Sequence, residues 1–537
     1  MSRNPSPVIA AALSLIFPGL GQIYAGAVRR GVLWALPTLA LILLAAIAIV
    51  GKVSLASLLT AEATLAVIAL EFAFLFYHLA AMLDAYGIAA RERKSSGFAV
   101  AGSATAGLIA LVIVAILLHG YPLYVSVIGN NALAALFPGR NDVVPSPSFS
   151  LEPMESIPAT DSPAPTTPGQ SPTATPTGGG STATPGATPG ATPTALPPLV
   201  TPYGDRLNLL LVGTDAGPDR PGARTDTMIL LSVDIPTGKA AMFGFPRNMT
   251  NVPIEDVSGN RQFNRLWADP DPPGNGDPAQ SLLTNMWQDA KTSPSKFYTP
   301  TDACQQSDPD LDQCLATARA YRALSGAIQN MAGVPIHGVI SVNLTAFREL
   351  VDAVGGIWMN IPEALYDEAY PVGAGDTESP HVINIPAGCH WLNGVYALAY
   401  ARSRHQDSDY QRMRRQQAVL QAVRRQFNPM DMLTRLDELL GVASNNLWTT
   451  IDRNDIPLLA QIAARVNADS IYNARITPNQ GYPSQLTPDE VKSIRSRVQH
   501  IFEQPQPAPE PTPADPKDRC PAPGQTPGET YNTKPVP

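Results

Sequence analysis

Residues 400–417, YARSRHQDSDYQRMRRQQ, decide how we interpret the fold of this chain. They hold five arginines, two aspartates and a histidine, and apolar runs flank them on both sides. We predict a strand at residues 395–399 that enters a charged loop and then becomes a helix. Because alternate side chains of a strand share one face, Arg402 and Arg404 are expected to point the same way.

The second half of this stretch is predicted to begin a helix. Ser408 is a suitable N-cap, and Asp409 then lies in the first turn, where the helix dipole favours negative charge. Asp409, Arg412 and Gln416 share one helical face. Fixed guanidinium groups beside a strand end suggest a clamp for phosphate, because the arginine fork matches phosphate geometry. A solvated basic helix start with ordinary ion pairs is the alternative.

The composition excludes some classes of protein. The chain has 537 residues, more than one compact domain requires, and a formal net charge of −8. With this charge, and without a zinc-finger or RNA-binding motif, we expect no nucleic-acid partner. The four cysteines form no CxxC pair, which argues against a zinc site.

The cysteines are expected to form disulfides if their part of the chain is exported. Cys304 and Cys314 are close enough in sequence to close a short loop. Cys389 with Cys520 would then tie the C-terminal tail to the domain. The sequence does not fix this pairing.

Apolar runs long enough to cross a bilayer occupy the first part of the chain, at Leu33–Val50, Leu58–Leu83 and Phe98–Leu118. An earlier run, Val8–Ala25, is interrupted by Pro18 and Gly19 and could be an interfacial hairpin, a re-entrant piece or a further span. A cleavable signal peptide is disfavoured because three spans follow at once. Residues 1–120 are therefore predicted to form an α-helical transmembrane region.

Basic residues predict the orientation of these spans. Arg29 and Arg30 precede the first long span, and the basic segment Arg91–Lys94 precedes the third. The positive-inside rule places both segments in the cytoplasm, so the chain after Leu118 is expected outside the cell membrane. We therefore predict a multi-pass membrane protein whose C-terminal domain is extracellular.

Two segments are too rich in Pro, Thr, Ser and Gly to bury a core. The first lies within residues 121–204, where ATPGATPGATPTA repeats, and is predicted to be a disordered extracellular spacer that holds the next domain off the membrane. The second is the Pro-rich tail, residues 504–537. Residues 205–503, between them, are enough for a domain with a sizeable core.

The domain at residues 205–503 is predicted to mix strands and helices. The expected strands are Leu207–Gly213, Thr227–Asp234, Ala240–Phe245, Gly338–Val342 and Ile357–Ile361. The expected helices are 281–289, 316–331, 344–354, 409–427, 430–443, 455–465 and 488–502. This order predicts an α/β fold, an α-β-α sandwich with a central mixed sheet, preceded by the transmembrane helices.

Charged residues occur where the first strands of this domain begin or end. Asp215 follows the first strand, and Arg247 follows the third. Arg224 and Asp226 open the second. In a hairpin fold these residues could meet at one rim of the sheet, where arginines would offset the charge of a pyrophosphate and carboxylates would help to bind Mg²⁺. Each residue taken alone also has an ordinary structural explanation.

The ordered set LLLVGTD, RTDTMILLSVD, FPRN, VDAVGGI and YARSRHQDSDYQRMRRQQ resembles the LytR–CpsA–Psr family over residues 205–500. The resemblance implies a phosphotransferase that moves glycopolymers from a polyprenyl-pyrophosphate carrier onto peptidoglycan, assisted by Mg²⁺ or Mn²⁺. The partners that it implies are the lipid-linked glycan, peptidoglycan and the membrane.

The resemblance assigns roles to single residues. Asp215 and Asp226 match the acidic positions associated with the metal ion. The phosphate-binding arginines of the family match Arg224, Arg247, Arg402 and Arg404. The resemblance also assigns Arg224 and Arg247 to catalysis, together with Asp226. The polar positions at the start of the long helix match Asp409, Arg412 and Gln416. Weaker candidates for substrate binding are Arg261 and Asn264.

Two positions qualify the resemblance. Asp352, in the motif VDAVGG, is interpreted mainly as a structural cap. Asn248 stands where the family commonly has Asp. If that carboxylate positions an arginine, Arg247 would be less firmly held here, and if it is an essential base, activity would be in doubt.

The leading hypothesis from sequence is phosphoryl transfer to a sugar hydroxyl. A non-catalytic polyprenyl-phosphate-binding regulator and a pyrophosphate hydrolase acting on the same lipid remain as alternatives. A DNA-binding regulator is disfavoured, because the arginine-rich stretch is expected outside the membrane.

Overall fold

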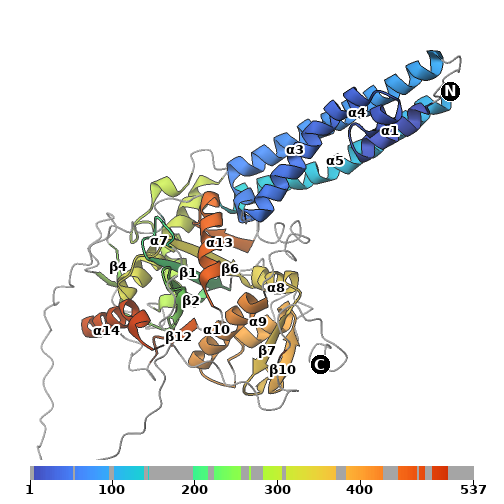
Figure 1. Ribbon diagram of the computed structural model, residues 1–537. Helices are drawn as coiled ribbons and strands as arrows, with labels where there is room; N and C mark the ends of the chain where they lie inside the picture. Colours follow the sequence, from blue (N-terminus) through green and yellow to red (C-terminus); the bar gives the residue numbers. More distant parts are fainter. Residues whose placement is uncertain are drawn as a thin grey trace, which may run out of the picture.

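The computed structural model describes residues 5–51, 55–95, 102–137, 143, 198–215, 223–255, 265–267, 282–304, 310–370, 382–404, 406–426, 446–467, 471–477, 486–505 and 520. These residues form a long helical bundle and a larger α/β domain that lies against one end of the bundle (Figure 1).

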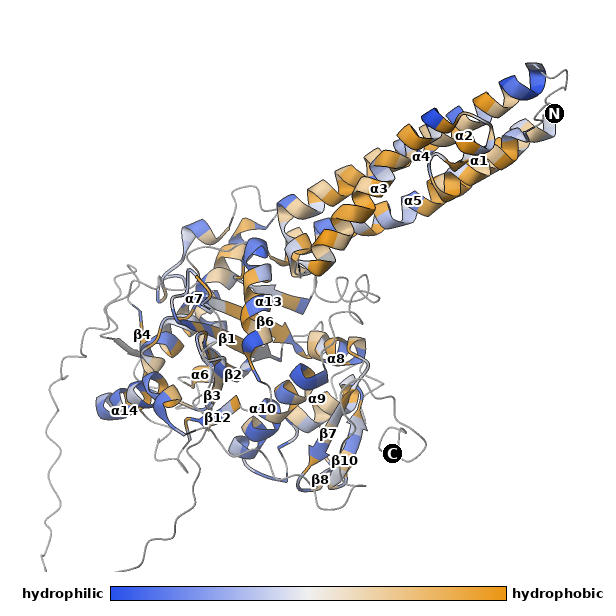
Figure 2. Ribbon diagram, viewed as in Figure 1, coloured by the Kyte–Doolittle hydropathy of each residue, from blue (hydrophilic) through white to orange (hydrophobic). Residues whose placement is uncertain are grey.

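The bundle contains three helices long and apolar enough to cross a membrane, namely α3 (Val28–Val50), α4 (Ala61–Ser95) and α5 (Gly102–Leu136). Each is apolar along most of its length (Figure 2). α5 continues past residue 120, where the predicted region ended. Because the helices alternate in direction, the start of α3, the end of α4 and the start of α5 lie toward the end of the bundle away from the large domain (Figure 2). Arg30 belongs to the first turn of α3, and Arg93 to the last turn of α4.

The interrupted apolar run before these helices forms a hairpin of α1 (Pro7–Ile16) and α2 (Leu20–Tyr24), which packs on the bundle. Gly19 turns the chain with a φ of 105°, and a Cβ there would meet the Gly31 carbonyl oxygen at 2.2 Å. Gln22 is fully buried, and its side-chain amide donates to the Ala81 carbonyl at 2.9 Å. The run is thus a pair of short helices, which fits an interfacial hairpin or a re-entrant piece and is not a continuous further span.

The large domain is built on a six-stranded sheet with the order β11-β6-β1-β2-β3-β12. Its strands are β1 (Arg206–Thr214), β2 (Thr225–Asp234), β3 (Lys239–Gly244), β6 (Gly338–Asn343), β11 (Leu447–Thr449) and β12 (Ile471–Arg475). The β1-β2-β3 meander is antiparallel, whereas β6 runs parallel to β1 and β12 parallel to β3. The sheet is therefore mixed, as predicted.

Helices cover both faces of this sheet. On one face lie α6 (Leu283–Thr292), α7 (Leu311–Ala332) and α14 (Pro488–Gln499), and on the other lie α10 (Asp409–Gln426) and α13 (Ile456–Arg465). Alternate strand residues supply the two cores: Leu230 packs in the core that contains Leu324 of α7, and Val233 packs with Ile462 of α13. The α-β-α sandwich expected from sequence is confirmed.

A smaller module packs against α10 and has its own core, which includes Val351, Ile357 and Tyr400. It consists of α8 (Leu344–Ala353), β7 (Ile357–Ile361), β8 (Leu365–Asp367), β9 (Ile383–Ile385), β10 (Gly388–Leu392) and α9 (Gly394–Arg402). The short elements elsewhere are β4 (Val252–Ile254), β5 (Arg265–Trp267), η1 (Leu55–Leu59), η2 (Thr301–Ala303), η3 (Arg453–Asp455) and η6 (Ile501–Glu503).

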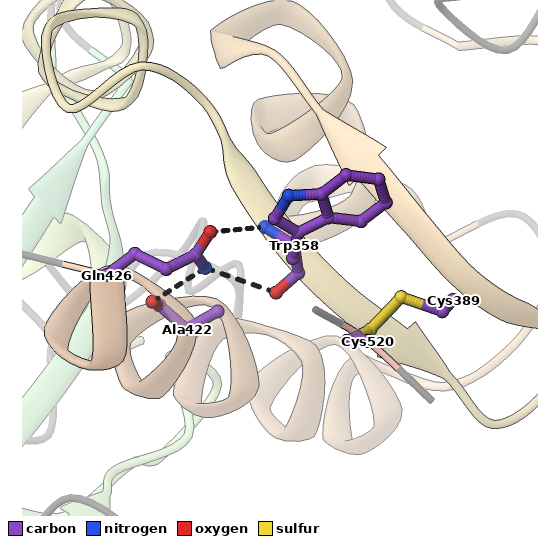
Figure 3. Close-up of a disulfide and its surroundings, with 5 residues drawn as sticks. All are labelled: Trp358, Cys389, Ala422, Gln426 and Cys520. Carbon is purple, nitrogen blue, oxygen red and sulfur yellow. Dashed lines mark hydrogen bonds between the residues drawn. A yellow bond between two sulfur atoms is a disulfide. The ribbon is translucent and has the colours of Figure 1, made fainter. Parts of the chain in front are cut away.

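Two disulfides close loops of the large domain, Cys304–Cys314 and Cys389–Cys520. The second joins β10 to the C-terminal tail, next to the point where Gln426 fastens the end of α10 to β7 (Figure 3). The Gln426 amide accepts from the Trp358 N–H at 2.8 Å and donates to the Trp358 carbonyl at 3.2 Å. The pairing that the sequence left open is thereby assigned.

Two expectations about this domain are wrong. Residues 395–399 belong to helix α9 and not to a strand; Asn393 caps this helix by accepting from Tyr396 N–H at 3.0 Å. A helix buried on several sides is apolar over a continuous run, which periodicity does not distinguish from a buried strand. The domain also touches the bundle directly and is not held away from it, because Arg453 donates to the Leu59 carbonyl at 2.6 Å. The predicted helix at 430–443 lies outside the described residues.

Candidate functional site

Arg247 lies at the centre of a charged cluster just beyond the end of β3. Its Nη1 is 2.5 Å from Asp226 Oδ1, at the start of β2. Its Nε is 3.3 Å from Asp409 Oδ1, in the first turn of α10. Two early strands and a late helix therefore meet at one rim of the sheet, as the sequence predicted.

Arg412 joins the same cluster from the second turn of α10, and only 3% of its side chain is exposed. Its Nη2 is 3.0 Å from Asp409 Oδ1 and donates to the Asp226 carbonyl at 3.1 Å. Its Nε is buried and finds no hydrogen-bond partner in the described part of the chain. The helix is thus fixed to β2, while one strong donor is left without an acceptor.

Several acceptors at this rim are also buried without hydrogen bonds to the described residues. Both carboxylate oxygens of Asp409 are of this kind, although they lie near two arginines. Asn248 Oδ1 and Thr284 Oγ1 are also buried without such a bond. Thr284 lies beside Arg247, because its N–H donates to the Arg247 carbonyl at 2.9 Å. Buried polar groups in proteins are almost always paired, so such a concentration at one rim indicates a site that a ligand completes.

The pKa values of the two arginines are shifted in opposite directions. Burial lowers the pKa of Arg247, but nearby carboxylates, Asp226 first, raise it by more, so its net pKa is raised. Burial also lowers the pKa of Arg412, and repulsion from Arg247 and Arg404 adds to this against the attraction of Asp409. An anion bound here would relieve the cost of burying the Arg412 charge.

Asp215 and Arg224 form an irregular end to the β1–β2 pair. Asp215 Oδ1 accepts from the Arg224 backbone N–H at 2.6 Å, and Asp215 N–H donates to the Arg224 carbonyl at 3.0 Å. The Asp215 carboxylate is near enough to contribute to the raised pKa of Arg247. The Arg224 side chain is exposed beside this rim, so both predicted residues border the cluster.

Arg402 and Arg404 do not share a strand face, because α9 ends at Arg402. The Arg402 guanidinium lies 5.6 Å from the centre of the Tyr370 ring, which belongs to the smaller module. Arg404 is exposed and close enough to repel Arg412. The structure therefore brings Arg404 to the cluster and places Arg402 against Tyr370.

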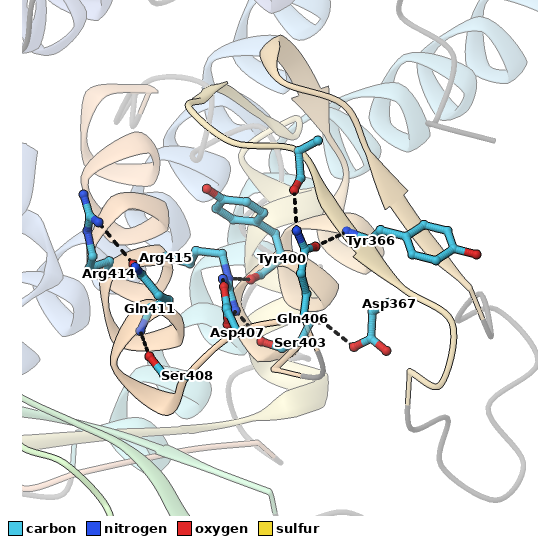
Figure 4. A network of polar contacts seen from close by, with 11 residues as sticks. Tyr366, Asp367, Tyr400, Ser403, Gln406, Asp407, Ser408, Gln411, Arg414 and Arg415 are labelled. Carbon is cyan, nitrogen blue, oxygen red and sulfur yellow. Dashed lines mark hydrogen bonds and ion pairs between the residues drawn. The ribbon is translucent and has the colours of Figure 1, made fainter.

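Sequence reasoning missed the residue that holds this loop, Arg415. Its Nε donates to the Tyr400 carbonyl at 2.8 Å, and its two terminal nitrogens donate to the Ser403 carbonyl and to Asp407 (Figure 4). Ser403 Oγ in turn donates to the buried Asp367 carboxylate at 2.5 Å. Because these bonds fix residues 400–407, Arg415 sets where the arginines of this loop lie.

The predicted start of α10 is correct, and the assignment of Gln416 to substrate binding stays a prediction. Ser408 Oγ accepts from Gln411 N–H at 3.4 Å. Gln416 is half-buried, and its side chain has no hydrogen bond to the described residues. The next residue, Gln417, donates to the carbonyls of Met242 and Ala474 at 3.1 Å each and so ties α10 to the sheet. A pattern of helical faces alone does not distinguish these neighbours.

Of the three remaining candidates, Asp352, Arg261 and Asn264, the described residues include only the first. Asp352 caps α9, because its Oδ1 accepts from Gly394 N–H at 2.7 Å, in agreement with a structural role. Arg261 and Asn264 lie outside the described residues, so their assignment stays a prediction.

The cluster fits a metal ion that a substrate helps to bind. Among the described residues, no group of three or more His, Cys, Asp or Glu side chains could hold a metal ion by itself. Mg²⁺ in phosphate-transferring sites is usually held by one or two carboxylates together with substrate phosphate oxygens. Asp215 and Asp226, which both act on the pKa of Arg247, are the two carboxylates that could take part in such a site.

A family model described as the LytR_cpsA_psr family matches residues 192–274 and 320–496. The chain belongs to the LytR–CpsA–Psr family. The two matched ranges contain β1, β2, β3 and α10, and also the four charged residues Asp226, Arg247, Asp409 and Arg412.

Curated relatives in this family share about a quarter of their residues with the chain. TagU of Oceanobacillus iheyensis, a polyisoprenyl-teichoic acid–peptidoglycan teichoic acid transferase, is 27% identical over 260 residues, which are 48% of this chain and 62% of TagU. Biofilm regulatory protein A of Streptococcus mutans is 24% identical over 302 residues, 54% of this chain and 62% of that protein. The matches thus span less than two thirds of either relative.

The solved structure of TagV from Bacillus subtilis is 19% identical to the chain. The superposition covers 56% of this chain and 98% of TagV with a TM-score of 0.36, which is too low to support an argument about the site.

Proposed function

We propose that the protein is a membrane-anchored phosphotransferase that moves a glycopolymer from a polyprenyl-pyrophosphate carrier onto peptidoglycan. One observation carries the proposal: Arg247 and Arg412 enclose Asp226 and Asp409 and leave a buried donor and buried acceptors without hydrogen bonds. Arginine forks bind phosphate oxygens in pairs. Family membership and the transferase activity named for TagU support the same reaction class.

In the proposed reaction, a hydroxyl oxygen of the peptidoglycan acceptor bonds to the phosphorus that carries the sugar. The bond from this phosphorus to the bridging oxygen breaks, and its electron pair leaves with the polyprenyl phosphate. The hydroxyl proton passes to a carboxylate of the site, Asp215 or Asp226. The side chains of Arg224, Arg247 and Arg412 would hold the pyrophosphate and offset the charge that develops on the leaving group.

Arg402, at the end of α9, and Arg404, just after it, would contact the same pyrophosphate. Mg²⁺ or Mn²⁺ would be held by the one of Asp215 and Asp226 that does not take the proton, together with phosphate oxygens, and would supply further charge stabilisation on the leaving group. Asp409 orients Arg247 and Arg412 toward the phosphates, since it lies within 3.3 Å of the Nε of the first and 3.0 Å of the Nη2 of the second.

The proposed location follows from the bundle. Its basic residues, such as Arg30 and Arg93, lie at the end away from the large domain, and the positive-inside rule assigns that end to the cytoplasm. The large domain would then face the cell exterior, where peptidoglycan and the glycan-bearing lipid headgroup are both accessible.

The test uses the full-length protein in lipid vesicles with a labelled lipid-linked glycan, Mg²⁺ and peptidoglycan. We expect label to become covalently attached to peptidoglycan, and chelation of the metal to stop this transfer. Replacing Arg247 by Ala should lower the rate about 100- to 1,000-fold, as loss of one charge-stabilising donor does in other enzymes. The matched control is Arg425→Ala, at the exposed far end of the same helix, which should leave the rate unchanged.

The products separate the alternatives. Release of free glycan phosphate in the presence of acceptor would indicate a hydrolase. Tight binding of polyprenyl phosphate with no product, at any metal concentration, would indicate a regulator. No transfer by the wild type, with Arg402→Ala and Arg404→Ala indistinguishable from it, would refute the proposal.

A further inference from the structure

The large domain makes specific contacts with the outer end of the bundle through Arg453, which begins η3. Only 5% of Arg453 is exposed. Its Nε donates to the Leu59 carbonyl at 2.6 Å, its Nη2 to Thr64 Oγ1 at 2.6 Å and its Nη1 to Asn130 Oδ1 at 2.9 Å. One side chain of the domain therefore binds η1, α4 and α5 at once.

An apolar contact lies beside this arginine. Leu133 and Leu136, at the end of α5, form a small core together with Leu59 and with Leu447 of strand β11. The edge strand of the domain sheet thus packs directly on the membrane helix that precedes it. Buried leucines and a saturated arginine make this contact a defined interface and not a chance approach of two tethered parts.

A third contact comes from the chain between the two parts. Val143 is fully buried in the main core of the domain, and Ser325 Oγ of α7 donates to its carbonyl at 3.3 Å. It lies seven residues after Leu136, the last residue of α5, so the chain between them spans at most about 25 Å. The domain core therefore includes a residue that precedes the Pro- and Thr-rich segment 144–197, and that segment does not set the distance to the bundle.

The strand register relates this interface to the charged cluster. Leu447 of β11 pairs with Val342 of β6, which pairs with Gly213 of β1. Gly213 pairs with Thr227 of β2, next to Asp226. Neighbouring strands lie about 4.8 Å apart, so the cluster is roughly 14 Å across the sheet from the strand that touches the bundle.

We propose that these contacts hold the domain in one pose on its own membrane bundle, and that this pose presents the charged cluster to a pyrophosphate whose lipid chain remains in the membrane. Arg453 is then a positioning residue for membrane-borne substrate. The substrate part of this inference rests on the proposed phosphotransferase function, whereas the pose itself does not.

The pose is tested first without any substrate. The full-length chain with Leu133→Cys and Leu447→Cys, in lipid vesicles, is oxidised with copper phenanthroline, and the new cross-link is followed by mass spectrometry. We expect rapid cross-linking that slows about tenfold when Arg453→Ala is added, since several hydrogen bonds of a charged group are lost. Absence of the cross-link, or a rate that Arg453→Ala leaves unchanged, would refute the pose even if the transferase proposal holds.

The consequence for substrate is tested with two donors. One is the full-length lipid-linked glycan in vesicles, and the other is a water-soluble short-chain pyrophosphate analogue. Arg453→Ala should raise KM for the vesicle donor about tenfold and leave kcat/KM for the soluble donor unchanged. Equal losses on both donors, or on neither, would overturn the positioning role. If neither donor turns over in the wild type, the transferase proposal fails while the cross-link still decides the pose.

Variants on the bundle side avoid any change to the domain. Thr64→Val and Asn130→Ala each remove one acceptor of Arg453. Each should raise KM for the vesicle donor only, and combining either with Arg453→Ala should raise it no further than Arg453→Ala alone. The matched control is Arg319→Ala, an equally buried arginine that donates within the domain to the carbonyls of Ala290 and Lys291. Arg319→Ala should lower thermal stability but leave the ratio of kcat/KM for the two donors unchanged.

Discussion

Two arginines three residues apart on α10 differ in how completely they are bonded. Arg415 donates from Nε and from both terminal nitrogens to Tyr400, Ser403 and Asp407 (Figure 4). Arg412 is at least as buried, yet its Nε has no partner among the described residues, and the carboxylate beside it accepts no hydrogen bond there. The same residue type on the same helix is thus saturated in one network and unsaturated in the other.

This difference separates a structural arginine from a binding one. A saturated guanidinium holds parts of the chain together, and Arg453 at the bundle is of this type. An unsaturated one costs stability unless a ligand completes its bonds, because buried polar groups without partners are unfavourable. The comparison predicts opposite consequences when each residue is removed.

The largest effect on stability is expected for Arg415→Ala. Removing this guanidinium leaves Asp407 and two loop carbonyls without their donor, so the free energy of unfolding should fall by about 3–5 kcal/mol. Thermal or denaturant unfolding measures it. Arg414→Ala is the control, because Arg414 is exposed and its loss should cost at most about 0.5 kcal/mol. Equal destabilisation by the two variants would break the comparison.

Arg412→Ala should act on activity more than on stability. Loss of a charge that meets the phosphates should lower the transfer rate about 100- to 1,000-fold. The unfolding free energy should change by less than for Arg415→Ala, since Arg412 already has an unsatisfied donor. Arg412→Lys keeps the charge but not the fork, and should recover only part of the rate. A variant that unfolds as readily as Arg415→Ala would assign Arg412 to the structural class.

The comparison also shows what the sequence could predict. The strands β1, β2 and β3 have continuous apolar patterns between clear turns, and their ends carry Asp215, Asp226 and Arg247; these positions were predictable. Helix α9 was not, because it is apolar on several sides and matches a buried strand equally well. Nor was the role of Arg415, because saturation depends on carbonyl groups of a loop whose path no side-chain pattern specifies.

Long-range contacts were the other limit. Val143 was assigned to the spacer because its neighbours are polar and Pro-rich, yet it is buried in the domain core. Arg453 gave no signal either, since its partners Leu59, Thr64 and Asn130 are more than 300 residues away in sequence. A single sequence contains the residues of such contacts but not their pairing.

A smaller change is expected at Asn248, where the family commonly has Asp. Its Oδ1 is buried without a hydrogen bond to the described residues. Arg247, however, already pairs with Asp226 and Asp409, so a third carboxylate is not needed to hold it. Asn248→Asp should therefore alter the transfer rate by only a few fold, about the effect of one charge pair that is not needed to hold Arg247. A rise of two orders of magnitude would show that the asparagine limits the proposed transfer reaction.

The smallest effect extends the comparison to a histidine whose Nδ1 has a structural hydrogen bond. His337 Nδ1 accepts from the Asn208 backbone N–H at 3.0 Å, so the ring must be neutral to keep this bond. Burial lowers the pKa of His337 to about 4, below its usual 6.5. Between these values the unfolded chain binds a proton that the folded chain does not, so stability should fall as the pH falls from 6.5 toward 4. His337→Gln should make the unfolding free energy of the domain less steep over this range, whereas an unchanged slope would assign the proton to another group.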